Sequence, residues 1–224
     1  MRFWRQAIEI ARVDLVVERR AGDTARVVLP FAIVATMVFP LALGLRLSLI
    51  REMGLGVFWA LGILFGMQVA LRQSASDTPE QRDLHALAGL DPAARFAGRS
   101  ISGVIVMTGF LFVLGAATTL LYDLDKSPSA LGALAGSTLL LSVGLTLLGT
   151  LAGEVTTGLR SRSALASLIV APLSLPLVIG ASQTVRAVDQ DTGILAWILL
   201  LVATDLALAV LGVALAKPLE EASR

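Results

Sequence analysis

The chain has 224 residues, of which 56% are hydrophobic and 16% are charged, and its mean hydropathy is +0.81. A soluble domain of this length does not hold so much apolar surface in its core, so the excess must face lipid. The net charge of +1 gives no reason to expect a nucleic-acid binder, and the absence of cysteine excludes disulfides, thiol catalysis and cysteine-ligated metal. The composition therefore predicts an integral membrane protein.

Residues 1–26 predict an amphipathic leader helix on the cytoplasmic side. One face of this helix carries Trp4, Ile8, Ala11 and Leu15. Charges recur too often for a cleavable signal peptide, so we expect the leader to stay attached. Its basic residues suit anionic headgroups, and we expect the helix to lie in the membrane interface. The alternative is a solvated helix that simply leads into the first span.

Six apolar segments follow, each close to the roughly 17 to 25 residues that cross the hydrocarbon layer as a helix. They cover 27–45, 55–72, 100–121, 129–153, 164–184 and 194–216. Their interiors hold almost no charge, as expected where side chains meet lipid. The sequence therefore predicts an all-α, polytopic protein with one transmembrane domain over 27–216 and a short tail over 217–224.

The orientation follows from the distribution of Lys and Arg between the spans, because cytoplasmic loops carry the excess. With the N-terminus inside, only four of the 18 basic residues fall outside, namely Arg46, Arg51, Lys126 and Arg186. An even number of spans returns the chain to its starting side. We therefore expect both termini in the cytoplasm.

The longest polar segment between spans covers residues 73–99, on the cytoplasmic side. Asp77 or Thr78 can cap a short helix that begins at Pro79, and Gly89 can end it. Three leucines recur on this helix at helical spacing, at Leu84, Leu87 and Leu90. The segment is the predicted docking surface for another protein.

Motifs for nucleotide, metal and acyl chemistry are missing. No GxxxxGK[ST] loop occurs, and neither Lys126 nor Lys217 lies in a Gly-rich stretch. The single His85 has no second His or Cys with which to hold a metal, and beside Asp83 it reads as a solvated residue rather than a catalytic one. We predict no catalytic, cofactor or metal site, and ATP would have to be bound by a separate subunit.

Three polar side chains fall inside predicted spans, at Gln68, Gln183 and Asp205. Such groups usually point into the bundle or a cavity. Asp205 is either a proton- or substrate-contacting group or an acid satisfied by a neighbouring helix or by Thr204. The two amides favour interhelical hydrogen bonds over a binding site.

Two prolines interrupt the fifth span, at Pro172 and Pro176. Because proline lacks the backbone N–H and bends helices, the pair predicts a kink. A kinked span either moves during transport or is held static by its neighbours.

The chain resembles the CcmB family, the permease subunits of the cytochrome c maturation transporter, also called haem exporter protein B. The likeness begins at FWRQAIEIARVDLVVERR, continues through Phe39 and Pro40 in the first span and Trp59 in the second, and ends at the basic GLR turn followed by APLSLPLVI. It covers nearly the whole chain.

The resemblance implies a permease of an ABC transporter in the bacterial inner membrane, a homodimer paired with a CcmA-like ATPase. It also implies haem-handling partners similar to CcmC, CcmD and the chaperone CcmE. Under this resemblance Glu80, Asp83, Leu84 and Leu87 form the contact with the ATPase. Haem would be handled by the complex, and either haem export or ATP-driven release of the haem-loaded chaperone fits.

Two other functions remain open. One is an ABC exporter permease for a lipid, drug or polysaccharide, which would differ in its partners. The other is a proton-coupled carrier or intramembrane enzyme, which requires Asp205 and Glu154 to face a shared cavity. Besides protein partners, membrane lipid is the only ligand class the sequence predicts, and nucleic acid is not expected.

Overall fold

The computed structural model describes residues 2–22, 24–42, 44, 46–74, 89–124, 127–156 and 162–222. Within these residues the secondary structure is helical without strands, and six helices are long and apolar enough to cross a membrane. These spans are Thr24–Ala42, Leu47–Gln73, Pro92–Leu121, Pro128–Val155, Leu168–Asp189 and Leu195–Leu219. The predicted all-α fold with six spans is confirmed, and the chain is a multi-pass membrane protein.

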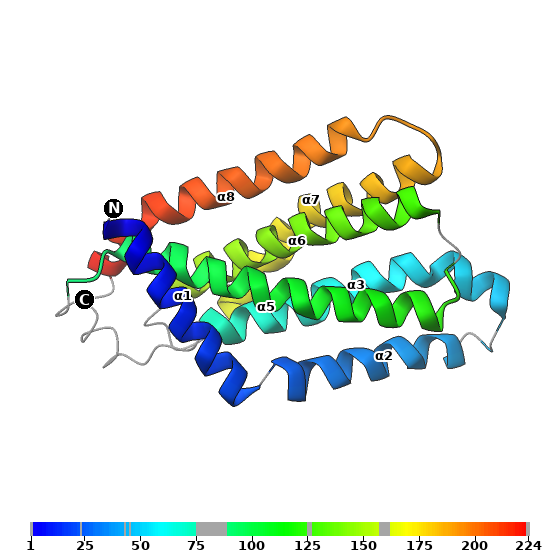
Figure 1. The fold of residues 1–224 in the computed structure, drawn as a ribbon, viewed down its shortest axis with the longest axis horizontal. Helices are drawn as coiled ribbons and strands as arrows, with labels where there is room; N and C mark the ends of the chain where they lie inside the picture. The colour runs from blue at the N-terminus through cyan, green and yellow to red at the C-terminus, as the bar shows by residue number, and fades with distance from the viewer. Residues whose placement is uncertain are drawn as a thin grey trace.

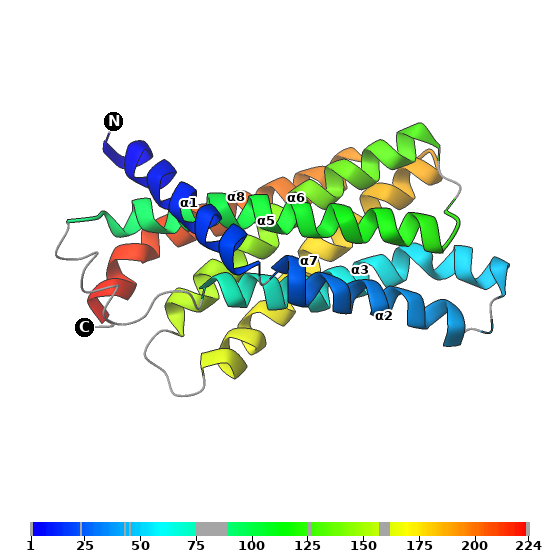
Figure 2. The same ribbon diagram turned by 60° about the horizontal axis from the view of Figure 1, so that its bottom comes forward.

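Helix α1 (Arg2–Ala21) precedes the spans. A five-residue π-helical turn, η1 (Thr24–Val28), connects it to α2 (Leu29–Ala42). Gly22 has a φ of +67° and turns the chain between them, a conformation that glycine adopts without a steric penalty. Both chain termini lie at one end of the molecule, where α1 crosses the bundle obliquely (Figures 1 and 2). We call this the terminal end and the opposite one the loop end.

Helix α6 lies at the centre of the remaining spans. They are α3 (Leu47–Ser74), α5 (Pro92–Leu121), α6 (Pro128–Val155), α7 (Arg162–Asp189) and α8 (Leu195–Ala222). Helix α6 packs against each of the other four. Fully buried side chains between them include Phe58, Met107, Leu111, Leu141, Leu145, Leu177 and Leu201. The core of the bundle therefore lies along α6.

Two of the spans begin at well-formed caps. Asp91 accepts a hydrogen bond from the Ala93 N–H at 3.0 Å, and Pro92 occupies the first helical position of α5. Ser127 does the same for α6, where its hydroxyl accepts from the Ala130 N–H at 3.3 Å. A capping oxygen followed by proline satisfies an orphan N–H and presets the helical φ.

The helices α3 and α5 begin well before the apolar segments from which they were predicted. Helix α3 begins at Leu47 rather than near 55, and α5 begins at Pro92 rather than near 100. The extra turns carry Arg51, Glu52 and two arginines of α5, which a hydropathy scan excludes. Backbone hydrogen bonding continues through charged residues, so helices extend past the hydrocarbon boundary.

The leader helix α1 packs on α5 through small residues, and Trp4 and Ile8 of its predicted apolar face stay outside that contact. Ala7 and Ala11 are buried against α5, whereas Trp4 and Ile8 are 63% and 59% exposed. Small residues allow the two helices to approach closely, because a Cβ on Gly98 of α5 would lie 2.6 Å from the Ala7 carbonyl oxygen. The large apolar residues of α1 are left to face outward.

Helix α7 continues through both of its prolines. The Ser174 hydroxyl between them donates to the Ala171 carbonyl at 2.8 Å. Neighbouring Ser and Thr hydroxyls are one way in which membrane helices tolerate proline. The kink at Pro172 and Pro176 stays a prediction.

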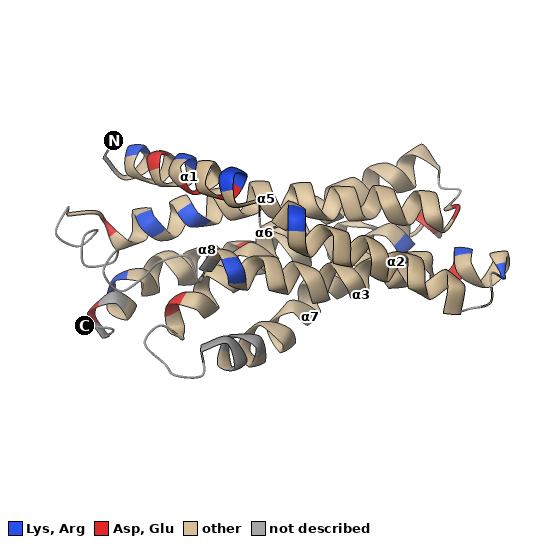
Figure 3. Cartoon of the chain, turned by 90° about the horizontal axis from the view of Figure 1, so that it is seen from below, with Lys and Arg blue, Asp and Glu red and all other residues tan. Residues whose placement is uncertain are grey.

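The outer surface of the bundle is apolar along the spans. Large exposed hydrophobic side chains lie on α2, α5 and α8, among them Phe31, Val34, Val38, Phe112, Leu199, Leu206 and Val210. Charged residues lie mainly in the half of the molecule nearer the termini and again at the loop end, and an uncharged stretch separates the two groups (Figure 3). A soluble protein does not expose such a continuous apolar band, whereas a lipid-facing one requires it.

Candidate functional site

The predicted docking helix falls in residues 75–88, outside the described residues. The positions Glu80, Asp83, Leu84 and Leu87 therefore stay predictions. The described chain leaves α3 at Ser74 and resumes with Gly89, two residues before the Asp91 cap of α5. Both described flanks lie toward the terminal end of the bundle (Figure 1).

The first turns of α5 carry a buried ion cluster that the sequence did not reveal. Arg95 Nη2 lies 3.5 Å from Glu154 Oε2, and Arg99 Nη1 lies 3.5 Å from Glu154 Oε1. The side chains of Arg95, Arg99 and Glu154 are only 6%, 9% and 12% exposed. Two cations four residues apart on α5 thus share one carboxylate at the end of α6. Buried charges persist where they are paired in this way.

Helix α1 contributes a further carboxylate beside this cluster. The Ser102 hydroxyl donates to Asp14 Oδ2 at 3.3 Å, across the contact between α5 and α1. A small cavity of about 60 Å³ lies here, lined by Asp14, Val17, Glu18, Gln73, Arg99, Ser102, Val106 and Thr150. It is roomy enough for ordered water among polar partners. We call Asp14, Arg95, Arg99, Ser102 and Glu154 the terminal cluster.

The terminal cluster joins helices α1, α5 and α6 at the terminal end of the bundle. The cluster holds these helices together by electrostatic attraction, because paired guanidinium and carboxylate groups resist separation in a low dielectric. The signals that could have revealed it are Arg95 and Arg99 at helical spacing directly before a span and Glu154 directly after one. Pairing between helices distant in sequence is a tertiary property, so these residues read only as span boundaries.

Asp205 lies in the middle of α8, against α6. Its side chain is 7% exposed, and within the described residues neither carboxylate oxygen has a hydrogen-bond partner. A Cβ on Gly144 of α6 would lie 2.6 Å from Asp205 Oδ1, so the missing side chain at Gly144 makes room for the acid. The Thr204 hydroxyl donates to the Leu200 carbonyl at 2.7 Å and does not satisfy Asp205.

Glu154 and Asp205 do not meet. Glu154 belongs to the terminal cluster, whereas Asp205 packs at Gly144, ten positions earlier on α6. At 1.5 Å per residue these positions are about 15 Å apart along the helix. A direct proton transfer between the two acids, which the carrier hypothesis requires, cannot span that distance.

The two amides lie in different surroundings. Gln68 is exposed on α3, so it does not bridge helices within one chain. Gln183 is half-buried on α7 and lines a cavity that α7 forms with α3 near the loop end. Among the described residues, no three His, Cys, Asp or Glu side chains gather in a way that could hold a metal ion.

Comparisons with known proteins agree with this architecture over almost the full length. Residues 5–221 match the family described as CcmB protein. Heme exporter protein B of Pseudomonas aeruginosa is 30% identical over 215 residues, which are 92% of this chain and 92% of the relative. The resemblance seen in the sequence is thereby confirmed, and the chain belongs to the CcmB family.

Proposed function

We propose that this chain is the permease subunit of an ABC transporter that acts in cytochrome c maturation. The observation that carries the proposal is the match to a relative named heme exporter protein B across 92% of both chains. Six spans and the CcmB family assignment support it. The chain works in the bacterial inner membrane as a homodimer with both termini in the cytoplasm, and a CcmA-like ATPase supplies ATP hydrolysis.

In this mechanism the segment over residues 75–88 docks on the ATPase. Movement of the ATPase displaces the cap and first turns of α5, where Asp91, Arg95 and Arg99 lie. The terminal cluster passes that displacement to α6 through Glu154 and to α1 through Asp14. Helices α5 and α6 then move together, because breaking a buried ion pair costs about 3 to 5 kcal/mol. The hydrogen bond from Ser102 to Asp14 keeps α1 in contact with them.

Haem is the cargo of the complex, and partners similar to CcmC, CcmD and CcmE handle it. The work of this subunit is mechanical: it converts ATP hydrolysis into rearrangement of the haem-handling complex. His and Cys are common ligands of haem iron; the chain has no Cys, and its one His, His85, falls in the docking segment. This distribution favours a mechanical role over passage of ligated haem along the bundle.

Affinity purification in mild detergent followed by mass spectrometry tests the proposal. We expect a P-loop ATPase together with haem-handling membrane proteins. An ATPase without those proteins would point to an ABC exporter of another substrate. Recovery of no ATPase from a preparation that keeps other membrane complexes intact would contradict the proposal.

The docking segment is tested by replacing Leu84 and Leu87 with Asp. We expect the ATPase to dissociate while the variant stays membrane-inserted, because charges on the apolar face prevent its burial at the interface. Arg82→Asp on the predicted wet face of the same segment is the matched control and should retain the ATPase. Equal recovery of the ATPase with both variants would remove the docking role of this face.

A further inference from the structure

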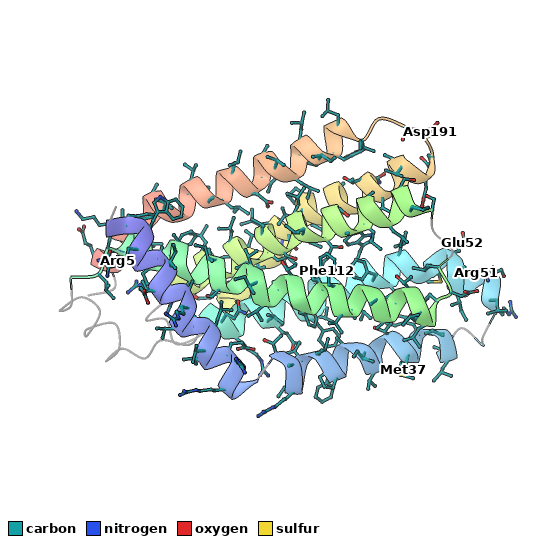
Figure 4. The ribbon with its side chains drawn as sticks, in the orientation of Figure 1. Arg5, Met37, Arg51, Glu52, Phe112 and Asp191 are labelled. Carbon is teal, nitrogen blue, oxygen red and sulfur yellow. The ribbon has the colours of Figure 1, made fainter. Side chains whose placement is uncertain are left out.

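A second cavity, with no part in the mechanism above, opens between α3 and α7 near the loop end. Its volume is about 500 Å³, within the range of roughly 300 to 1,000 Å³ in which small molecules bind. It is lined by Arg51, Glu52, Leu55, Gly56, Trp59, Val178, Ser182, Gln183, Arg186 and Asp189. Arg51 and Glu52 lie at the end of the molecule farthest from Arg5 (Figure 4).

The deeper part of the cavity is apolar. Trp59 is 6% exposed, and Leu55 and Val178 are half-buried beside it. A Cβ on Gly56 would meet no atom within 4 Å, so the wall is open at that position. Trp59 lies two to three turns beyond Arg51 on α3, which places the indole about 12 Å farther along the helix. The cavity thus extends from a charged rim toward the middle of the span.

The rim carries both signs of charge. Arg186 and Glu52 are exposed, and neither has an ion-pair partner in the part of the chain that the structure describes. Arg51 is already paired with Asp123. Gln183, half-buried between rim and floor, offers both amide donors and a carbonyl acceptor.

This arrangement matches a ligand with an anion and a cation at one end and a hydrocarbon chain at the other. A ligand with negative charges alone could pair with Arg186 but would leave Glu52 without a cation, and like charges at close range repel. A zwitterionic headgroup can place its anion against Arg186 and its cation against Glu52. In a bundle that spans a membrane, the zwitterion with a hydrocarbon tail that surrounds the protein is a phospholipid.

We propose that the cavity between α3 and α7 binds a phospholipid of the phosphatidylethanolamine type, with its headgroup at the rim and one acyl chain against Trp59. Arg186 binds the phosphate, Glu52 accepts hydrogen bonds from the primary ammonium, and Gln183 donates to an ester carbonyl. The acyl chain passes Leu55 and Val178 to the indole. This site is independent of the cargo of the transporter.

Quenching of Trp59 fluorescence by dibrominated phospholipids tests the site. The variant Trp4→Phe/Trp197→Phe leaves Trp59 as the only tryptophan of the three, and because Trp59 is buried, a brominated chain contacts the indole chiefly through the cavity. Phosphatidylethanolamine, phosphatidylcholine and phosphatidylglycerol with identical brominated chains are compared. We expect phosphatidylethanolamine to bind about tenfold more tightly than phosphatidylglycerol, the effect of one charge-assisted hydrogen bond.

Matched variants separate the two headgroup contacts. Glu52→Gln should lower the affinity for phosphatidylethanolamine to that for phosphatidylcholine, whose quaternary ammonium cannot donate. Arg186→Gln should weaken all three lipids, whereas Arg46→Gln, at the same end but outside the cavity, should change nothing. In a Trp59→Phe/Trp197→Phe variant, the exposed Trp4 should be quenched without headgroup preference.

Absence of quenching, or equal quenching by the three lipids, would overturn the proposal. If the double Trp variant does not fold, native mass spectrometry of the unaltered protein released from mixed micelles replaces the fluorescence measurement. One retained phosphatidylethanolamine for each chain, lost in Glu52→Gln, is the expected result. Retention of the three lipids in proportion to their supply would equally overturn it.

Discussion

Glu154 is the residue on which the terminal cluster depends, because its carboxylate faces two buried guanidinium groups. Glu154→Gln would remove the charged carboxylate that Arg95 and Arg99 share, where their side chains are only 6% and 9% exposed. We expect the free energy of unfolding in mixed micelles to fall by about 3 to 5 kcal/mol. Denaturation by sodium dodecyl sulfate, followed by tryptophan fluorescence, measures the loss.

The matched control is Asp123→Asn, which breaks the ion pair with Arg51 at the loop end. There the side chains of Arg51 and Asp123 are 54% and 66% exposed, so solvent screens the interaction and we expect a loss of at most about 1 kcal/mol. Equal losses for the two variants would mean that the terminal cluster is solvated in the membrane-inserted protein.

At the scale of elements, the crossing of α1 over α5 depends on Gly98. Gly98→Leu would place its Cβ 2.6 Å from the Ala7 carbonyl oxygen and 2.8 Å from the Ile10 Cβ, and a backbone carbonyl has little room to move. We expect α1 to separate from α5, at a cost of about 1 to 3 kcal/mol for overpacking. Trypsin should then cleave within α1, at Arg12, Arg19 and Arg20, faster than in the unaltered protein.

Gly109→Leu on the same helix is the control for that experiment. A Cβ on Gly109 meets no atom within 4 Å, so the larger side chain fits without moving a helix. Unchanged tryptic cleavage is expected for this variant. If both variants expose α1 to the same extent, the close approach at Gly98 does not hold the helix in place.

The sequence predicts well those elements whose structure is decided by contact with lipid. Each span is found because its side chains must be apolar over the width of the bilayer, whatever their neighbours. The elements decided by contacts between helices are missed. Arg95 and Arg99 read as the end of a loop, and the pattern of α1 does not show that Ala7 and Ala11 pack on another helix.

The same distinction applies to the candidate site. The sequence groups Glu154 with Asp205, because both are acids near apolar segments, but its partners Arg95 and Arg99 lie on α5, 59 and 55 positions earlier in the chain. Sequence periodicity describes one helix at a time and cannot reveal such a pairing. The buried hydrogen bond from the Tyr122 hydroxyl to the Thr36 carbonyl, at 3.0 Å, ties α5 to α2 and is equally invisible in the pattern.

At the scale of the whole molecule, the proposed function requires the terminal end to face the cytoplasm. The distribution of Lys and Arg favours this orientation, since the connections at the loop end and their flanking turns carry only Arg46, Arg51, Lys126 and Arg186 of the 18 basic residues. Because the chain has no cysteine, a single introduced cysteine reports its own position. Arg5 and Asp191 are both exposed and lie at opposite ends of the bundle (Figure 4).

We expect a membrane-impermeant maleimide to label Asp191→Cys in spheroplasts with intact inner membranes and to label Arg5→Cys only after the membrane is permeabilised. Both variants should react equally in detergent, which controls for the intrinsic reactivity of each site. The reverse pattern would place residues 75–88 on the periplasmic side of the membrane, where a cytoplasmic ATPase could not dock. It would therefore contradict the coupling mechanism as a whole, while leaving the six-span fold and the terminal cluster unchanged.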